Sequence, residues 1–416
     1  MVNGRKVLVI PGIVAVVAAG AACSGSSASS TAAKPFTTRA DQALTLTPAQ
    51  VLAATGGATP VAFGAPANGK LTYGPSGTMV YTPNKGFSGT DQFQVTTTDA
   101  VKLYAVDTPP IATIGGVAIQ SSANGSAIAA VPEKTDEIYG MTDRGPNVDG
   151  RTDNEKVLPV PDFHPQIAVF RLSEGTATPG KTIILKGPDG EQLVGLVDPQ
   201  ANTGESLVTI DGQPLPPSDH GLDTEGLVAV SEITALTNTE FLVDERDGEL
   251  QPGGNKKIYV TDMSNATDVG PNATVLGGVY SADAGGLQVE GKPIETLVGV
   301  STDAAAIDKL RSVGITVASK TLKLDLGALL TELNDKGEFF GHDKIEGLAT
   351  PDGGKTLVIA NDSDFGLAGI DSETPPFKLK PKTLANGRPD TGEFVAVDTT
   401  KLPPQTRQLT VSIKVG

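Results

Sequence analysis

The chain has 416 residues, of which 49 are Gly and 30 are Pro, while aromatic residues make up 4% and no Trp occurs. Gly and Pro interrupt helices and populate turns, so this composition favours many short strands over a helical protein. Asp and Glu outnumber Lys and Arg by 48 to 32, and the formal net charge of −16 argues against nucleic-acid binding because such a surface repels phosphate backbones.

The first residues show the pattern of an export signal. Arg5 and Lys6 precede an apolar run at 7–19, and small residues follow up to Cys23. A basic start, an apolar middle and small residues predict a signal peptide, and the only cysteine lies where a lipoprotein carries its lipid. Residues 1–23 are therefore predicted to export the chain and to leave it anchored on the outer face of the membrane through Cys23. Cleavage without lipidation, giving a secreted protein, is the alternative.

Two further segments precede the main domain. Residues 24–40 are rich in Ser, Ala and Thr and are predicted to be a flexible linker. In 41–106 polar and apolar residues alternate, as at 78–82, and this period of two predicts half-buried antiparallel strands. The run at 81–93 resembles the bacterial Ig-like, cadherin-like repeat of secreted proteins, which implies a small β-sandwich that acts as a spacer.

Short strands separated by turn residues continue through 107–416, and helical patterns occur only near 304–311 and 326–333. Regular short strands of this kind predict a sandwich, a barrel or a propeller. The distance from Glu225 to Glu346, which head two similar strands, is close to three propeller blades of ~40–45 residues each. The predicted fold is therefore all-β, with an N-terminal Ig-like β-sandwich followed by a β-propeller of about six or seven blades.

Acidic residues recur at the predicted strand ends. A Glu-Gly pair at 346–347 heads one strand, and the returning strand ends in Asp362 and Asp364; an earlier copy begins at 223–226 and ends at 244–245. Equivalent positions in propeller blades converge on the central channel. Converging carboxylates need a cation or raised pKa values, and Ca²⁺ prefers oxygen ligands; capping of loops by these side chains is the alternative. The predicted Ca²⁺ ligands are Asp143, Asp223, Glu225, Asp244, Glu245, Glu346, Asp362 and Asp364.

Four residues are predicted to act on the substrate. Arg144 carries a forked donor suited to phosphate oxygens, although an Arg–Asp pair that holds a loop would leave the same pattern. His220 and His342 stand just ahead of the two Glu-Gly motifs, where each is a candidate general acid or base or an ordinary loop histidine. Glu346 completes the catalytic set and is shared with the metal site.

Five motifs, in this order, resemble the phytase-like esterase family, described as "esterase-like activity of phytase". The resemblance covers roughly residues 110–416 and implies a secreted bacterial β-propeller, rich in recurrent Asp and Glu, that hydrolyses phosphoesters. Ser363 replaces an expected Asn, and 246–248 replace an aromatic-Gly-Pro segment. The motifs are at 142–147, 163–167, 223–227, 344–349 and 361–365.

These observations predict a cell-surface, metal-dependent phosphoric-ester hydrolase. Ca²⁺ would neutralise phosphate charge and lower the pKa of bound water, and the substrate would be a small phosphorylated molecule. No nucleic-acid partner is expected, and membrane contact is expected only through the lipid at Cys23. Two alternatives stay open: a non-catalytic propeller that binds a surface partner and is stabilised by Ca²⁺, and a lactonase-like propeller enzyme.

Overall fold

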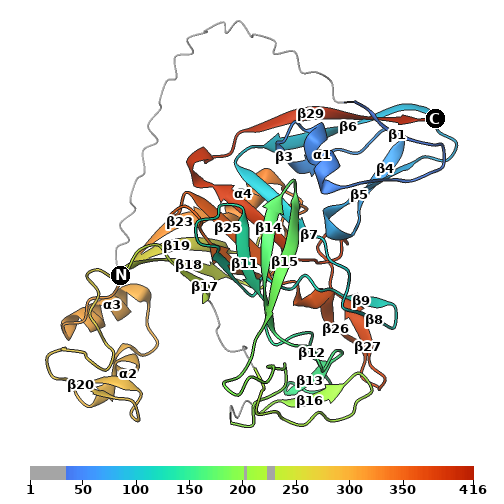
Figure 1. Ribbon diagram of the computed structural model, residues 1–416. Coiled ribbons are helices and arrows are strands. Elements are labelled where there is room, and N and C mark those ends of the chain that lie inside the picture. Colours follow the sequence, from blue (N-terminus) through green and yellow to red (C-terminus); the bar gives the residue numbers. More distant parts are fainter. Residues whose placement is uncertain (1–33, 201–203, 223–229) are drawn as a thin grey trace, which may run out of the picture. The chain divides into compact units, whose positions relative to one another are not determined.

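The computed structural model describes residues 34–200, 204–222 and 230–416 (Figure 1). Strands account for 43% of the structure and helices for 10%, which confirms the predicted all-β class. The predicted signal peptide, with Cys23, lies outside the described residues. Within the described ranges, no helix is both long enough and apolar enough to span a membrane.

The Ig-like part consists of two small sheets that pack against each other. Tyr81 from one sheet and Phe93 and Val411 from the other share one buried cluster, as the alternation of apolar residues predicts. A short helix, α1 (Pro48–Ala54), begins at Thr47, whose hydroxyl accepts a hydrogen bond from the backbone N–H of Gln50. The sheets contain β1 (Phe36–Thr38), β29 (Thr406–Val415), β6 (Gly89–Thr98) and β3 (Thr59–Phe63) in one, and β2 (Leu44–Leu46), β5 (Met79–Pro83) and β4 (Gly69–Tyr73) in the other.

The last strand of the chain returns to this first part. β29 pairs with β6 along ten residues and also pairs with β1, so it lies inside the sheet (Figure 1). The predicted division into 41–106 and 107–416 does not include this return. A strand from the C-terminus therefore holds the Ig-like part to the rest of the chain.

The largest sheet has eight strands and is nearly closed. Its edge strands, β10 and β24, contact each other, and all eight strands contribute to one interior cluster in which Phe170 and Phe394 lie 5.3 Å apart. Closure requires glycine, because a Cβ at Gly125 would lie 2.0 Å from the carbonyl oxygen of Asn361. The strands, in sheet order, are β10 (Ala127–Ala130), β11 (Glu137–Met141), β14 (Gln166–Ser173), β15 (Thr176–Ile184), β7 (Val101–Val106), β28 (Glu393–Asp398), β25 (Thr356–Asn361) and β24 (Ile345–Ala349).

A four-stranded antiparallel sheet packs beside β24. Leu242 and Ile258 of this sheet share a buried cluster with Leu348 and with helix α4. Both predicted helices are confirmed, as α3 and α4. The elements are β17 (Val230–Ala235), β18 (Glu240–Arg246), β19 (Lys256–Asp262), β23 (Ser319–Asp325) and α4 (Leu326–Leu333), with β20 (Gly278–Ser281), β21 (Gly286–Val289), β22 (Lys292–Pro293), α2 (Ile294–Val298) and α3 (Asp303–Ser312) inserted between β19 and β23.

Smaller sheets complete the structure. Phe163 and Phe365 pack edge to face at 5.2 Å within a cluster that joins these sheets. The three small sheets consist of β12 (Val148–Asp149), β13 (Glu155–Leu158) and β16 (Ser206–Thr209); of β26 (Leu367–Ser372) and β27 (Lys378–Pro381); and of β8 (Ala112–Ile114) and β9 (Val117–Ile119).

These sheets do not confirm the predicted propeller of six or seven blades. A propeller repeats separate four-stranded sheets around a channel. Among the described strands between 101 and 398, eight instead join edge to edge in one barrel-like sheet, and the others form smaller sheets of two to four strands. The local pattern of a strand, a turn and an acid-ended strand is compatible with either arrangement.

Candidate functional site

A charged cavity of about 830 Å³ lies at the ends of several strands. Asp143 follows β11, Glu346 is the second residue of β24, and Asp362 and Asp364 follow β25. The structure thus brings together four of the predicted metal ligands. Six carboxylates and five basic side chains line the cavity: Asp143, Asp149, Asp343, Glu346, Asp362, Asp364, Lys156, Arg246, Lys344, Lys380 and Lys382.

Ion pairs organise these charges. Lys344 Nζ lies 2.6 Å from Asp364 Oδ1, and Lys382 Nζ lies 2.7 Å from Asp364 Oδ2 and 2.8 Å from Asp343 Oδ1. Arg246 pairs with Glu346. Burial opposes the charge on Lys344 and Lys382, but the neighbouring carboxylates outweigh it and raise the pKa of both ammonium groups, so both stay protonated.

Asp362 is a buried carboxyl among other carboxyls. It is 2% exposed, and its Oδ1 accepts a hydrogen bond of 3.0 Å from the backbone N–H of Asp364. Asp364 and Phe365 have φ values of 48° and 54°, and this tight turn brings both Asp side chains to the cavity. Burial, and after it the charges of Asp364, Asp143 and Glu346, raises the pKa of Asp362 well above its ordinary value.

Asp244, another predicted ligand, does not line the cavity. It is fully buried in β18, and neither of its carboxylate oxygens accepts a hydrogen bond from the described residues. Burial raises its pKa to about 7, although Arg246 and Lys256 act in the opposite direction. Its neighbour Glu245, another predicted ligand, points elsewhere and pairs with Lys320.

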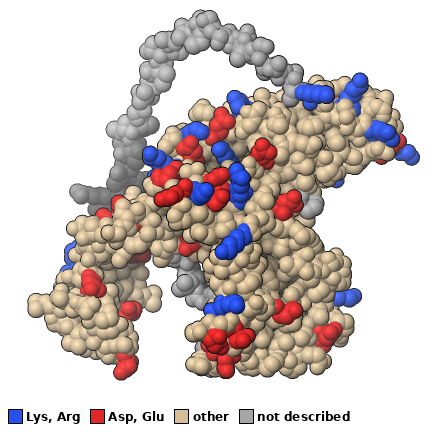
Figure 2. Space-filling model, in the orientation of Figure 1, with Lys and Arg blue, Asp and Glu red and all other residues tan. Residues whose placement is uncertain are grey.

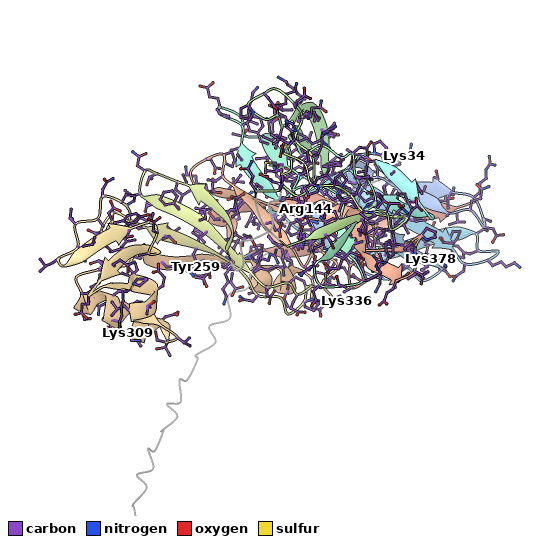
Figure 3. The ribbon with its side chains drawn as sticks, turned by 90° about the horizontal axis from the view of Figure 1, so that it is seen from below. Lys34, Arg144, Tyr259, Lys309, Lys336 and Lys378 are labelled. Atoms are coloured by element: carbon purple, nitrogen blue, oxygen red, sulfur yellow. The ribbon has the colours of Figure 1, made fainter. Side chains whose placement is uncertain are left out.

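The structure does not bring Arg144 to the charged cavity. This side chain is 1% exposed and its guanidinium donates to both oxygens of Glu205, at 2.6 and 3.3 Å; Figure 3 shows it among the crowded side chains at the centre of the view. The backbone carbonyl oxygen of Arg144 also packs against Gly195, where any larger residue would clash, because a Cβ there would lie 2.0 Å from this oxygen. Arg144 thus holds the loop after β11 in place next to Asp143.

Neither predicted catalytic histidine lines the cavity. His220 is partly exposed, and its Nε2 lies 2.7 Å from Asp189 Oδ2. His342 is fully buried, with Nδ1 2.8 Å from Asp390 Oδ1 and Nε2 2.9 Å from Glu393 Oε2. The remaining predicted ligands, Asp223 and Glu225, lie outside the described residues.

A buried chain of charges connects His342 to the cavity. Arg388 donates to both oxygens of Glu393, with Nη2 at 3.0 Å from Oε2, and Glu393 contacts His342. On the other side of His342, Asp390 lies 3.3 Å from Lys382 Nζ, which lines the cavity. Neither Lys344 nor Lys382 is among the site residues predicted from the sequence. Lys344 is the first residue of the motif at 344–349, while no local pattern marks Lys382.

The carboxylates of the cavity do not by themselves form the predicted Ca²⁺ site. Within the described ranges, no group of three or more Asp, Glu, His or Cys side chains is arranged to hold a metal ion. Asp364 and Glu346 face Lys and Arg instead. The Ca²⁺ site, which includes Asp223 and Glu225, stays a prediction.

Figure 2 shows that acidic and basic side chains lie next to each other on the visible face.

Comparison with known families places two matches on the chain. Residues 198–365 match the phytase-like family, described as "Esterase-like activity of phytase", and residues 27–111 match a bacterial Ig domain. Both resemblances drawn from the sequence are thereby confirmed. The first match includes Glu346, Asp362 and Asp364. No curated protein and no solved structure matches the chain.

Proposed function

We propose that this chain is a hydrolase of phosphoric esters that works in the charged cavity, because residues 198–365 match the phytase-like family. The family match supports hydrolysis as the type of reaction. The charged cavity supports a phosphoric ester as the substrate. Five Lys and Arg side chains gather there, although acidic residues outnumber basic ones in the chain by 48 to 32. Six carboxylates line the cavity beside them, so the basic share is higher there than in the whole chain, and these cations would bind the oxygens of an anionic substrate.

An uncharged lactone would make no use of these cations, so the phosphoester is preferred over the lactonase alternative. Lys344, Lys382 and Arg246 would hold the non-bridging oxygens of the phosphoryl group and stabilise the charge of the transition state. Their present partners, Asp364, Asp343 and Glu346, keep them charged and oriented.

Asp362 is the proposed proton acceptor. A carboxyl whose pKa is raised is a stronger base than an ordinary carboxylate when ionised. In the proposed step, a water oxygen bonds to phosphorus, its proton passes to Asp362, and the bond from phosphorus to the ester oxygen breaks. The leaving oxygen takes a proton from solvent, so the products are an alcohol and inorganic phosphate.

The test is the release of inorganic phosphate from phytate, and of the alcohol from a generic phosphodiester, by purified mature protein. We expect Asp362→Asn to lower kcat by about 10²- to 10⁴-fold, the usual contribution of a proton-transfer group. Asp283→Asn, the same change at an exposed carboxylate that does not line the cavity, should leave kcat unchanged. An Asp362→Asn variant with wild-type kcat would contradict the proposal. A wild-type protein that hydrolyses neither ester favours the non-catalytic surface-binding alternative, and one that opens only lactones favours the lactonase.

A requirement for Ca²⁺ is tested separately from the roles of Asp362 and the three cations. Exhaustive chelation followed by Ca²⁺ titration should lower and restore both activity and the melting temperature if the predicted site exists. Activity that survives chelation would remove Ca²⁺ from the reaction and leave the roles of Asp362 and the three cations unchanged.

Export to the cell surface is also proposed, from the signal pattern and from the bacterial Ig domain at residues 27–111. The test is cell fractionation. Wild-type protein should stay with the membrane, and Cys23→Ala should appear in the medium if the lipid is the anchor.

A further inference from the structure

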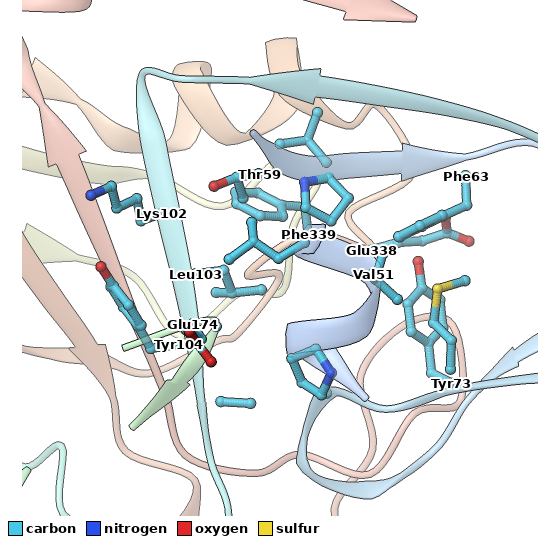
Figure 4. A pocket seen from close by; sticks show the side chains of 18 of the residues that line it. Val51, Thr59, Phe63, Tyr73, Lys102, Leu103, Tyr104, Glu174, Glu338 and Phe339 are labelled. Carbon is cyan, nitrogen blue, oxygen red and sulfur yellow. The ribbon is translucent and has the colours of Figure 1, made fainter. Parts of the chain in front are cut away.

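A second cavity, of about 340 Å³, lies between the Ig-like part and the eight-stranded sheet. Its walls come from α1, β3 and β4 on one side and from β7 on the other (Figure 4). Most of the lining is apolar. It includes Val51, Phe63 and Phe339, and Leu103 on β7. This size and lining are typical of small-molecule sites, which occupy about 300–1,000 Å³ and favour domain boundaries.

The walls are held in place by hydrogen bonds outside the cavity itself. Asn334 Nδ2 donates to the carbonyl oxygen of Val61 on β3 at 2.7 Å, and both groups are buried. The backbone N–H of Ala105 on β7 donates to the carbonyl oxygen of Gly175 at 3.0 Å. The space is therefore formed before any ligand arrives.

Two hydrogen-bond donors of the lining, Tyr73 and Arg388, lie next to each other. Tyr73 contributes a hydroxyl whose pKa is raised by burial and then by the charge of Glu338, so it stays protonated and able to donate. Arg388 is 6% exposed and its guanidinium lies 5.7 Å from the centre of the Tyr73 ring. Its Nε–H donates to no acceptor among the described residues, while its other nitrogens hold Glu393.

We propose that this cavity binds a small neutral molecule with an apolar body and one hydrogen-bond acceptor, such as a ketone, an ester or an amide. The apolar walls would take the body, and Tyr73 or Arg388 would donate to the acceptor. A buried donor without an acceptor destabilises the folded state, so a ligand that supplies the acceptor gains binding free energy.

A neutral acceptor suits the site better than a carboxylate. The charge of Arg388 is already balanced by Glu393, and Glu338 and Glu174 also line the cavity. An anionic group near Tyr73 and Arg388 would therefore meet these carboxylates, and the other cation of the lining, Lys102, is an exposed side chain on β7. This inference is independent of the proposed hydrolysis, because the two cavities have no lining residue in common.

The probe is 6-propionyl-2-dimethylaminonaphthalene, which is neutral, carries one ketone and shifts its emission to the blue in apolar surroundings. We expect saturable binding to the full chain with such a shift. Leu103→Phe, which fills the cavity, should abolish the shift, whereas Leu322→Phe, the same change at a half-exposed site on β23, should not. No saturable binding to wild type, or undiminished binding to Leu103→Phe, would overturn the proposal.

Tyr73→Phe tests the acceptor separately. It should weaken binding of the ketone by about threefold to tenfold, the usual effect of one hydrogen bond, and leave unchanged the binding of 2-dimethylaminonaphthalene, which lacks the ketone. Tighter binding of 2-naphthoate than of either neutral probe would show that the ligand is anionic and would overturn the proposed class. Far-UV circular dichroism of each variant confirms the fold, and Tyr73→Phe remains informative if Leu103→Phe does not fold.

Discussion

Two carboxyl groups in this protein are buried to nearly the same degree, but their pKa values are shifted in opposite directions. Glu393 is 1% exposed and Asp362 is 2% exposed. Burial opposes the charge of Glu393, but Arg388 and His342 outweigh it and lower its pKa to about 2. Asp362 has the charges of Asp364, Asp143 and Glu346 around it, and its pKa is raised. Burial is common to both, so the sign of the shift comes from the neighbours.

The difference separates a structural carboxylate from a candidate functional one. A buried charge is stable only when paired and hydrogen-bonded, and Glu393 meets that condition. Asp362 does not, and groups kept in such unfavourable surroundings cluster at active sites. Substitution of each carboxyl by its amide should therefore affect stability in opposite directions.

The largest effect is expected from Glu393→Gln. Loss of this charge leaves the guanidinium of Arg388 buried without its partner, and breaking such a pair destabilises by about 3–5 kcal/mol. Chemical denaturation at neutral pH measures the change, with Glu373→Gln on the exposed surface as the matched control. Because the pKa of Glu393 is lowered in the fold, its contribution is present above the unfolded pKa of about 4.3 and is lost as pH falls towards 2. Equal stability of Glu393→Gln and wild type at pH 7 would contradict the pairing.

The opposite sign is expected at Asp244. Its pKa is raised to about 7, so the folded state disfavours the ionised form and wild-type stability should fall as pH rises from about 4 to about 7. Asp244→Asn removes that dependence, and above pH 7 the variant should be more stable by a few kcal/mol, at about 1.4 kcal/mol for each pKa unit. Denaturation midpoints at pH 4 and pH 8 test this. A variant less stable than wild type at pH 8 would show that Asp244 has a partner in the folded protein.

Local patterns explain how much of this structure the sequence could predict. The alternation at 78–82 and the apolar run at 326–333 determine strand and helix directly, since side-chain period and propensity act within a few residues. The Glu-Gly pair at 346–347 was recognised as a repeated signal, and the structure gives it a packing reason: a Cβ at Gly347 would lie 3.0 Å from the carbonyl oxygen of Gly125.

Pairing between distant segments could not be predicted in this way. Nothing near 406–415 indicates that this strand returns to β6, and the barrel-like sheet depends on edge contacts that local spacing does not encode. The same holds for the site. The end of a strand marks Asp362 and Asp364 in the sequence, but Lys382, which pairs with Asp364, follows β27 in another hairpin. The sign of a pKa shift needs both partners, so sequence alone could not separate Asp362 from Glu393.

His342 sharpens the comparison through its pH dependence. Burial opposes its charge, but Asp390 and Glu393 outweigh burial and raise its pKa. The stabilisation is therefore complete below the unfolded pKa of about 6.5 and is lost as pH rises through the raised folded pKa. We expect His342→Gln to be less stable than wild type at pH 6 and to show a smaller loss of stability between pH 6 and pH 9. A parallel pH profile for both proteins would mean that His342 stays neutral in the fold.

The smallest effect is expected at His220, the exposed counterpart of His342. The hydrogen bond that its ring donates to Asp189 raises its pKa too, but solvent surrounds the pair and weakens it. His220 does not line the charged cavity, so His220→Gln should leave both the melting temperature and the turnover of a phosphoester unchanged. A loss of turnover at wild-type stability would return His220 to the catalytic set that its position ahead of a Glu-Gly motif predicted. Unchanged turnover in His220→Gln, beside a large loss of turnover in Asp362→Asn, would instead locate the chemistry at the buried, uncompensated carboxyl.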